Sequence, residues 1–419
     1  MSQADKPNIL VVQFGSRRQY DMPIALDRAG MLEALYTDLT GSAGIGKLVA
    51  PLADKLGGRF RKLAKRQIPP EVAAKTTSFP SWTLEMEQAA RQGSSAERAR
   101  AYIDAHENVG AKMVRKGFGD ASHLLVIFME AQGMLTAAKQ AGLTTISDMV
   151  IALSAERIVR EERRRHPGWE PDGYFWGETL TKDVPAFRPS AETLAMTDIF
   201  LCPSTFVQDD LVENFGVPRE KTLLVPYTTN PMFLEIEPKT EKGRIFFAGE
   251  PGLRKGIHTL AEAARNLRER GHDYEFRIAG HVTDTVRNRP ETSELNFLGR
   301  IPHDQMRGEL AAADVFAFPS IAEGSAGVTY EAMGARVPIV TTPEAGGVAR
   351  HGVDGLIVPR GNPEALADAI ERIVENRDLR ETLAASAREK AREYSWDTFS
   401  TRLPEAIMSF GAARSIAEE

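Results

Sequence analysis

The chain has 419 residues, of which 26% are charged and 42% hydrophobic, and its formal net charge is −6. Such a length favours two or more domains, and the near-average composition is typical of an ordinary soluble protein. The single cysteine, Cys202, excludes an internal disulfide and favours a reducing compartment. Cys202 lies in the apolar run IFLCP, which predicts a buried structural thiol.

The amino terminus and the apolar stretches argue against secretion and against a membrane span. The first residues, MSQADKPNILVVQFG, lack a charged-then-apolar leader, and no apolar stretch approaches the length of a bilayer. Nothing in the chain resembles a nucleic-acid-binding module. We therefore expect a cytoplasmic protein with no nucleic-acid partner.

Six short apolar runs in the first half of the chain predict buried strands. They are NILVVQF, ALYTDL, HLLVIFM, LTTISDMV, DIFLCP and TLLVPY. Helical patterns separate them, one at about 21–28 and a long one from Ser94 to Gly117, where Ser94 and Glu97 form a capping box. Alternation of this kind, with right-handed crossovers, indicates a doubly wound α/β domain.

A change in composition marks a domain boundary after Tyr227. The segment TTNPMFLEIEPKTEKG is rich in Pro, Lys and Glu and separates two arrays of strands and helices. We therefore expect an amino-terminal domain at 1–230 and a carboxy-terminal domain at 231–396.

The second array begins with a strand, a glycine-rich turn and a basic pair. The sequence RIFFAGEPGLRKGIHTLAEAA, from Arg244, predicts a strand followed by a helix whose apolar side is Ile257, Leu260, Ala261 and Ala264. Arg254 and Lys255 stand at the start of that helix, where they are natural counter-charges for a diphosphate. A basic pair at such a place is, taken alone, usually solvated.

Two carboxylates frame a small-residue turn further along the chain. Residues 319–333 read PSIAEGSAGVTYEAM, with Glu323 at the carboxyl end of a predicted strand and Glu331 about two helical turns away. Ligands of open α/β sheets bind at such strand ends. The small residues between the carboxylates leave room for a ligand near the helix amides; they are Gly324, Ser325, Ala326 and Gly327. Carboxylates accept hydrogen bonds from vicinal hydroxyls, so the pair indicates a sugar nucleotide, although an isolated pair would more often be a loop acid and a solvated helix acid.

Four motifs give the second half a specific resemblance. They are AGEPGLRKG at 248–256, NFLGRIPHDQM at 296–306, PSIAEGSAGVTYEAMGARVPIVTT at 319–342 and HGVDGLIVPRGNPEALADAI at 351–370. On these residues the chain resembles the family 4 retaining glycosyltransferases. The resemblance implies the GT-B fold, in which two Rossmann-like, doubly wound parallel-sheet domains face a cleft. It also implies that the last helix, at 397–419, packs back on the first domain.

The resemblance also assigns roles to residues of the second domain. It implies that Glu323 contacts hydroxyls of the donor sugar, that Glu331 holds the ribose, and that Arg254 and Lys255 hold the diphosphate. The backbone near Ile301 is expected to face the nucleobase. Neither a divalent metal nor a cofactor is required by this arrangement, and the sequence shows no Asp-x-Asp motif or histidine cluster with a suitable ligand context.

The chain departs from the family pattern at three places. Glu250 stands where relatives commonly carry arginine, and GSAG at 324–327 replaces the usual glycine–aromatic–glycine. The histidine that many relatives place after the strand at 123–129 cannot be identified, because His123 comes too early and is better explained as a packed or edge residue. Glu130 and Asp148, at strand ends that face the crevice, are weaker candidates for the acceptor side.

The first domain offers two further features near its first strand. Gly15 follows that strand, where either a close backbone approach to the donor phosphate or a simple turn explains the glycine. Arg17 and Arg18 come next and suit an anionic acceptor or phosphate, although loop arginines are often solvated.

Two basic segments have different patterns. Residues 45–66 combine apolar positions at helical spacing with seven Lys or Arg residues, which suits either peripheral contact with an anionic membrane surface or packing on the domain. Residues 157–166, RIVREERRRH, include two glutamates and are more typical of a solvated helix face.

Taken together, the sequence predicts a retaining glycosyltransferase that moves a sugar from a nucleoside diphosphate sugar to a glycan, glycolipid or other glycoconjugate, in the cytoplasm or at the inner face of the membrane. Alternatives on the same fold are a sugar-nucleotide epimerase, a phosphorylase, or a non-catalytic sugar-nucleotide-binding protein. A dinucleotide oxidoreductase is least expected, because no G-x-G-x-x-G follows the first strand.

Overall fold

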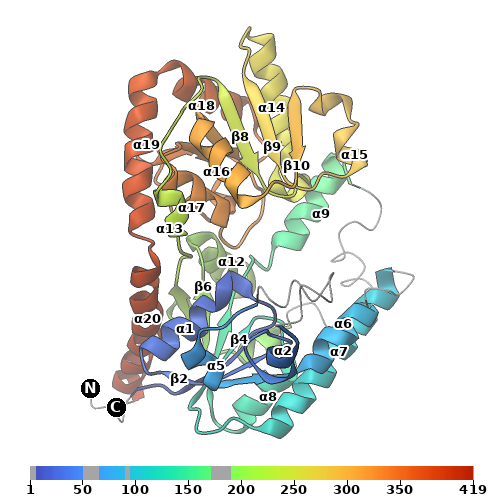
Figure 1. Ribbon diagram of the computed structural model, residues 1–419, viewed down its shortest axis with the longest axis vertical. Helices are drawn as coiled ribbons and strands as arrows, with labels where there is room; N and C mark the ends of the chain where they lie inside the picture. Colours follow the sequence, from blue (N-terminus) through green and yellow to red (C-terminus); the bar gives the residue numbers. More distant parts are fainter. Residues whose placement is uncertain (1–5, 51–65, 90–94, 171–189, 419) are drawn as a thin grey trace.

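The computed structural model describes residues 6–50, 66–89, 95–170 and 190–418, and it contains two parallel β-sheets, one in each half of the chain (Figure 1). The first sheet has the strand order β3-β2-β1-β4-β5-β6-β7, and the second has the order β10-β9-β8-β11-β12-β13. Both orders reverse beside the first strand of the array, which is the doubly wound topology that the sequence predicts.

The first sheet contains all six predicted strands. Its members are β1 (Ile9–Val12), β2 (Leu32–Thr37), β3 (Thr76–Ser78), β4 (His123–Ile127), β5 (Thr144–Asp148), β6 (Ile199–Cys202) and β7 (Thr222–Leu224). Only β3 escaped prediction, because its sequence TTS is polar and lies at the edge of the sheet. The inner strands β1 and β6 are buried along their whole length, and Cys202 is buried as expected.

The second sheet is the centre of a separate hydrophobic core. It consists of β8 (Arg244–Ala248), β9 (Glu275–Ala279), β10 (Leu295–Gly299), β11 (Val315–Phe318), β12 (Ile339–Thr341) and β13 (Gly355–Ile357). Phe246, Phe247, Phe316 and Phe318 on the central strands β8 and β11 are fully buried. Continuous apolar runs of this kind form strands that are covered on both faces.

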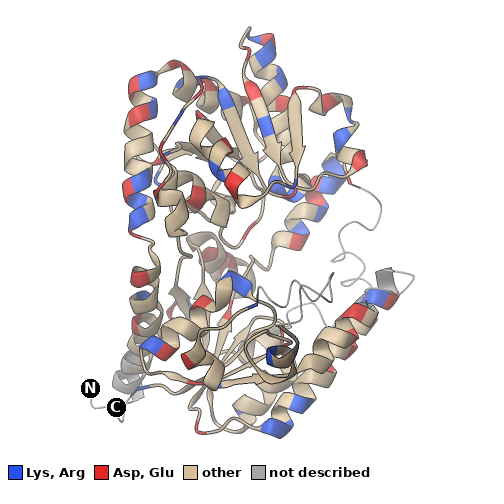
Figure 2. Ribbon diagram, viewed as in Figure 1, with Lys and Arg blue, Asp and Glu red and all other residues tan. Residues whose placement is uncertain are grey.

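Helices cover both sheets. In the first half they are α1 (Asp21–Arg28), α2 (Gly44–Val49), α5 (Pro70–Ala74), α6 (Pro80–Ala89), α7 (Ser95–Lys116), α8 (Gln132–Gln140), α9 (Ala155–Arg165), α11 (Ala191–Ala195) and α12 (Thr205–Phe215). In the second half they are α13 (Pro231–Leu234), α14 (Ile257–Glu269), α15 (Asp284–Arg287), α16 (His303–Ala312), α17 (Gly327–Gly334), α18 (Pro363–Glu375), α19 (Arg377–Arg392) and α20 (Trp396–Glu418). The expected cap at Ser94 lies outside the described residues. Figure 2 shows that Lys, Arg, Asp and Glu are concentrated on the helices, while the strands carry few of them.

The last helix crosses from the second domain to the first. In Figure 1, α20 continues below α19 and runs beside α1. Its residues Phe399, Leu403 and Ile407 belong to the same buried apolar cluster as Ile9 and Leu26 of the first domain. The hydrophobic core of the first domain therefore includes residues from the end of the chain.

Helix α9 and the residues after it dock on the second domain, which differs from the predicted solvated face. Arg164 and Arg165 are exposed, as expected, but the opposite side of α9 is buried. Trp169, shortly after α9, is buried in the core of the second domain, and the Leu253 amide donates a hydrogen bond of 3.0 Å to Glu170 Oε1. The sequence could not show this, because the partners come from the other half of the chain.

A second direct contact joins the two domains at the turn after β11. A Cβ built on Gly324 would lie 2.1 Å from the carbonyl oxygen of Val150, so only glycine fits this approach. The Ser204 hydroxyl donates a 2.5 Å hydrogen bond to the Gly324 carbonyl, and the Ala152 amide donates a 3.3 Å hydrogen bond to the Glu323 carbonyl. The domains are therefore in contact at the carboxyl edges of their sheets.

Candidate functional site

The basic pair is held against the carboxylate turn by close backbone packing. Arg254 and Lys255 belong to the 3₁₀ turn Leu253–Lys255 between β8 and α14. Gly256 follows with φ of +72°, and a Cβ there would lie 1.9 Å from the Pro319 carbonyl oxygen. The Ser320 hydroxyl also donates a 2.8 Å hydrogen bond to the Arg254 carbonyl. These contacts bring together two loops that follow neighbouring strands of the second sheet.

Glu323 lies in the middle of this pair of loops and is 7% exposed. Arg254 Nη1 is 2.8 Å from Glu323 Oε1, and Lys255 Nζ donates a hydrogen bond to the same oxygen. The Ser320 hydroxyl oxygen lies 2.9 Å from Glu323 Oε1, so its single proton is shared between this carboxylate and the Arg254 carbonyl. Burial alone would raise the pKa of Glu323, but the charges of Lys255 and Arg254 outweigh burial and lower it. The carboxylate is therefore ionised at neutral pH.

The cluster keeps an excess of positive charge and a free carboxylate oxygen. Two cations face one carboxylate, so one positive charge is left for an anionic ligand. Burial lowers the pKa of Lys255 despite the neighbouring Glu323. In the described part of the chain the partners of Glu323 all meet Oε1, which leaves Oε2 available to a hydroxyl donor.

The small residues after Glu323 have different environments. Ser325 and Ala326 are buried, and the Ser325 hydroxyl donates a 2.7 Å hydrogen bond to the Gly346 carbonyl. Gly327 is exposed, and a Cβ there would meet nothing within 4 Å. Among the described residues, the amides of Gly327 and Val328 at the start of α17 have no acceptor. An anion can approach α17 here, rather than at Ser325 or Ala326.

Glu331, in the middle of α17, lines a cavity of about 440 Å³ between the domains. The cavity is lined by residues of the first domain, of the connection between domains and of the start of α20, including Arg18, Gln19, Tyr227, Asn230 and Trp396. Burial raises the pKa of Glu331 from 4.5 to about 7. No ion pair or side-chain hydrogen bond to Glu331 occurs within the described ranges, so its carboxyl group is available to a ligand.

The loop after β1 supplies the opposing wall in an unusual backbone conformation. Gly15 has φ of +71°, its amide donates a 2.8 Å hydrogen bond to Asp38 Oδ1, and the space beside its Cα is open. Arg18, Gln19 and Tyr20 then have φ of 46°, 55° and 62°. Consecutive non-glycine residues in the left-handed region are strained and are enriched at functional sites.

The four charged candidates of the first domain form two ion pairs. Arg17 Nη2 is 2.6 Å from Glu130 Oε1, and Arg18 Nη2 is 3.2 Å from Asp148 Oδ2. Arg18 also lies 3.2 Å from Asp21 Oδ2. Burial raises the pKa of Glu130 to about 7, and Glu130 Oε2 is buried with no hydrogen-bond partner among the described residues. The sequence placed these residues at one sheet edge but could not show that they pair.

Comparison with known proteins identifies the second domain. Residues 242–376 match the family model of glycosyl transferases group 1. The matched residues lie within the carboxy-terminal domain, which we call the group 1 domain below. A D-inositol 3-phosphate glycosyltransferase of Corynebacterium urealyticum is 32% identical over 39% of this chain and 42% of its own length. A phosphatidyl-myo-inositol mannosyltransferase of Mycobacterium leprae is 30% identical over 43% of this chain and 50% of its own length. The chain spans about half the length of the curated relatives it matches.

Solved structures extend the similarity to both domains at the level of fold. The structure of Anabaena HepE in complex with UDP and glucose aligns with 96% of this chain over the whole length of HepE, with a TM-score of 0.59 and 17% sequence identity. Sucrose-phosphate synthase from Thermosynechococcus elongatus covers 97% with a TM-score of 0.62 and 16% identity, again over its whole length. The predicted GT-B arrangement of two Rossmann-like domains is thereby confirmed.

The remaining expected positions of the group 1 domain lie at the same sheet edge or close to it. Ile301 is half-buried in the loop between β10 and α16. Glu250, in the turn after β8, is exposed, and its negative charge favours the charged form of Lys255. In the first domain, His123 is the half-buried first residue of the central strand β4, and its Nδ1 is 2.8 Å from the Ser122 hydroxyl, as suits the packed residue of the two expected possibilities.

The basic amphipathic segment is described only at its two ends. Helix α2 exposes 62% of Ile45 and 76% of Leu48. Arg66 does not extend a basic face, because its guanidinium is 2.6 Å from the buried Asp38 carboxylate. Residues 51–65 lie outside the described part of the chain. No helix in the described part is both long and apolar enough to cross a membrane.

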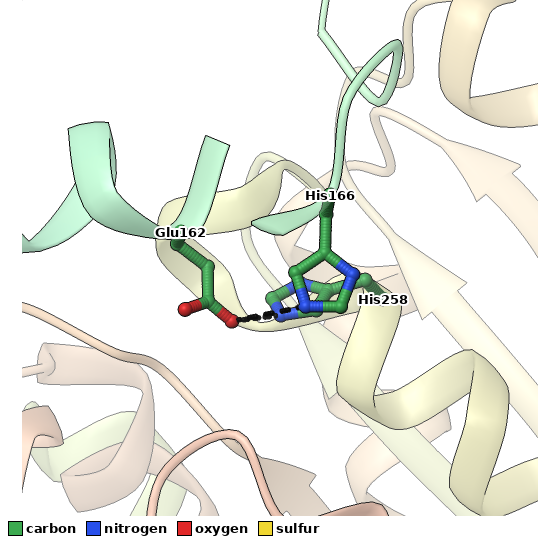
Figure 3. A group of neighbouring side chains, drawn as sticks. All are labelled: Glu162, His166 and His258. Atoms are coloured by element: carbon green, nitrogen blue, oxygen red, sulfur yellow. Dashed lines mark hydrogen bonds and ion pairs between the residues drawn. The ribbon is translucent and has the colours of Figure 1, made fainter. Parts of the chain in front are cut away.

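Sequence reasoning missed one cluster of possible metal ligands. Glu162 lies on α9 and His166 directly after it, and both meet His258 of α14 across the boundary between the domains (Figure 3). The Glu-x-x-x-His spacing places two of these side chains one helical turn apart and is a signal visible in the sequence. The third member could not be assigned, because it comes from the group 1 domain.

Proposed function

We propose that this protein is a retaining glycosyltransferase that uses a nucleoside diphosphate sugar as its donor. The observation that carries the proposal is the cluster of Arg254, Lys255 and the buried Glu323 at the carboxyl edge of the second sheet, within the residues that match the group 1 model. It combines one surplus positive charge for a diphosphate with a carboxylate oxygen for sugar hydroxyls. HepE, which has the same fold, is described in complex with UDP and glucose.

Each donor group has a candidate partner. Arg254, Lys255 and the open amides at Gly327 and Val328 would hold the diphosphate. Glu323 Oε2 would accept hydrogen bonds from the transferred sugar. Glu331 would accept hydrogen bonds from the ribose, the backbone at Ile301 would face the base, and Gly15 would let the first domain approach the phosphates closely.

The chemistry follows from where charge develops. When the bond to the anomeric carbon breaks, negative charge grows on the diphosphate, and the fixed charges of Arg254 and Lys255 stabilise it. The partial burial of both side chains lowers the local dielectric and strengthens this effect. Reaction on one face of the sugar, with the leaving phosphate helping to take the acceptor proton, gives retention and uses neither a catalytic metal nor a cofactor.

We place the acceptor against the first domain. Arg18, which pairs with the buried Asp148, lines the cavity between the domains, and Arg17, which pairs with the buried Glu130, is exposed; the two arginines would meet an anionic acceptor. The similar proteins from Corynebacterium urealyticum and Mycobacterium leprae carry names that specify an inositol phosphate and a phosphatidyl-inositol. A glycan, glycolipid or lipid-linked acceptor fits this class, and the exposed Ile45 and Leu48 are suited to peripheral contact with the cytoplasmic face of a membrane.

The proposal is tested by transfer of label from UDP-, GDP- and ADP-sugars to inositol phosphate, phosphatidylinositol and an oligosaccharide, with the product anomer assigned by NMR. We expect retention of configuration in one of these pairings. Lys255→Ala and Glu323→Gln should each lower turnover about a hundredfold or more. Lys242→Ala is the matched control, because Lys242 forms an exposed ion pair with Glu375 in the same domain.

The alternatives give different results in the same assay. Interconversion of the donor without an acceptor would instead indicate an epimerase, and dependence on inorganic phosphate would indicate a phosphorylase. Tight nucleotide binding without transfer to any acceptor would indicate a binding protein. Wild-type turnover in Lys255→Ala or Glu323→Gln would refute the assignment of the site.

A further inference from the structure

Three potential metal ligands converge where the two domains meet. Glu162 Oε1 is 2.7 Å from His258 Nε2 and 3.4 Å from His166 Nε2 (Figure 3). One ligand atom from each residue lies within 4.8 Å of the others. The two imidazole rings are 4.5 Å apart between centroids. The three side chains thus point at one small volume between α9 and α14.

The ligand types and spacings fit a transition-metal ion. Two imidazoles and a carboxylate are a common ligand set for zinc, and ligands about 2.0–2.1 Å from a tetrahedral ion lie roughly 3.3 Å from one another. The Glu162–His166 separation already has about this value, and the Glu162–His258 separation of 2.7 Å needs to open by about 0.6 Å. Side-chain rotation alone can supply such a change.

The surroundings hold two of the ligands firmly and leave access at the third. The side chains of Glu162 and His258 are 9% and 4% exposed, whereas that of His166 is 35% exposed. Water can therefore reach the site from the His166 side and fill a fourth position. Arg165 Nη1 lies 3.3 Å from Glu162 Oε2 and orients the carboxylate, while its charge opposes a cation and limits affinity.

We propose that Glu162, His166 and His258 bind one Zn²⁺-like transition-metal ion, which joins the first domain to the group 1 domain. His258 follows Lys255 by three positions, so the ion would fix the start of α14 and the basic turn before it. The ion is structural in this account: it has no place in the transfer reaction, for which no catalytic metal is expected. The site also does not depend on the proposed function, because it can be tested without donor or acceptor.

The test uses the full-length protein, stripped with a chelator, desalted and titrated with Co²⁺ and Zn²⁺. We expect one equivalent of Co²⁺ with the visible absorption bands of tetrahedral coordination, displaced by one equivalent of Zn²⁺. His166→Gln is the key variant, because this half-exposed side chain can be replaced without emptying a core position. It should weaken binding at least tenfold and abolish the tetrahedral spectrum.

Further variants separate metal binding from simple hydrogen bonding. His258→Gln and Glu162→Gln should also lose the spectrum, whereas His303→Gln, an exposed histidine of α16, should keep it. Zn²⁺ should raise the melting temperature of the wild type and of His303→Gln but not that of His166→Gln. If the wild type takes up no Co²⁺ or Zn²⁺, or if His166→Gln binds as the wild type does, the three residues form only a hydrogen-bonded contact and the proposal is wrong.

Discussion

Replacing Glu331 with glutamine should stabilise the protein and weaken nucleotide binding at once. Burial without a charged partner raises the pKa of Glu331 from 4.5 to about 7. Because the folded-state pKa is the higher one, the folded protein holds this proton more tightly, and stability falls as the pH rises from about 4.5 to 7. At pH 8 the ionised carboxylate costs at most about 3 kcal/mol of folding free energy, since one pKa unit corresponds to about 1.4 kcal/mol.

Glutamine has nearly the same shape and no charge, so Glu331→Gln removes this cost at pH 8. For a domain of this size, about 3 kcal/mol corresponds to an upward shift in melting temperature of roughly 6–12 °C. At pH 5 the wild-type carboxyl is mostly protonated in the folded state, and the advantage should fall below about 1 kcal/mol.

Thermal unfolding at pH 5 and pH 8, followed by circular dichroism, measures both effects. The control is Glu213→Gln, an exposed glutamate of α12, which should shift neither midpoint. A gain for Glu331→Gln that is equal at the two pH values, or no gain at pH 8, would refute the reasoning. Nucleoside diphosphate affinity should fall in the same variant, because an amide replaces a charged acceptor of ribose hydroxyls.

Two glycines give paired predictions about the geometry of the site. Gly324→Ala should push the domains apart, because its Cβ would lie 2.1 Å from a carbonyl of the first domain. The control is Gly327→Ala, where the space beside the glycine is open. Small-angle scattering should show a larger radius of gyration for Gly324→Ala than for Gly327→Ala. Equal radii would show that the contact is not required. Gly256→Ala should lower the melting temperature more than Gly271→Ala, because both have positive φ but only the former would clash, at 1.9 Å, with the carbonyl at the end of β11. Equal losses would mean that backbone strain alone matters.

The strands and the donor-side loops were predictable because their signals are local. Buried parallel strands are continuous apolar runs, so β1, β4, β8 and β11 are evident in the sequence. Lys255 and Glu323 each follow such a strand, and the carboxyl ends of parallel strands meet at one edge of the sheet. Their proximity could therefore be expected, although the direct ion pair could not.

Contacts between distant segments were not predictable. Glu162 and His258 come from different domains, so nothing in either local pattern indicates that they meet. The pairing of Arg17 with Glu130 depends on the left-handed backbone that follows Arg17, and no glycine marks that conformation in the sequence. Trp169 looks like a loop residue until the core of the second domain is seen around it.

The most direct test of the account is nucleotide binding at the basic pair. UDP, GDP and ADP should be titrated into the wild type, Lys255→Ala and the surface control Lys242→Ala, with the melting temperature as readout. We predict that at least one nucleotide raises the melting temperature of the wild type and of Lys242→Ala, and that the shift is lost in Lys255→Ala. No shift in the wild type with any of the three, or an undiminished shift in Lys255→Ala, would contradict the claim that this cluster holds a nucleoside diphosphate.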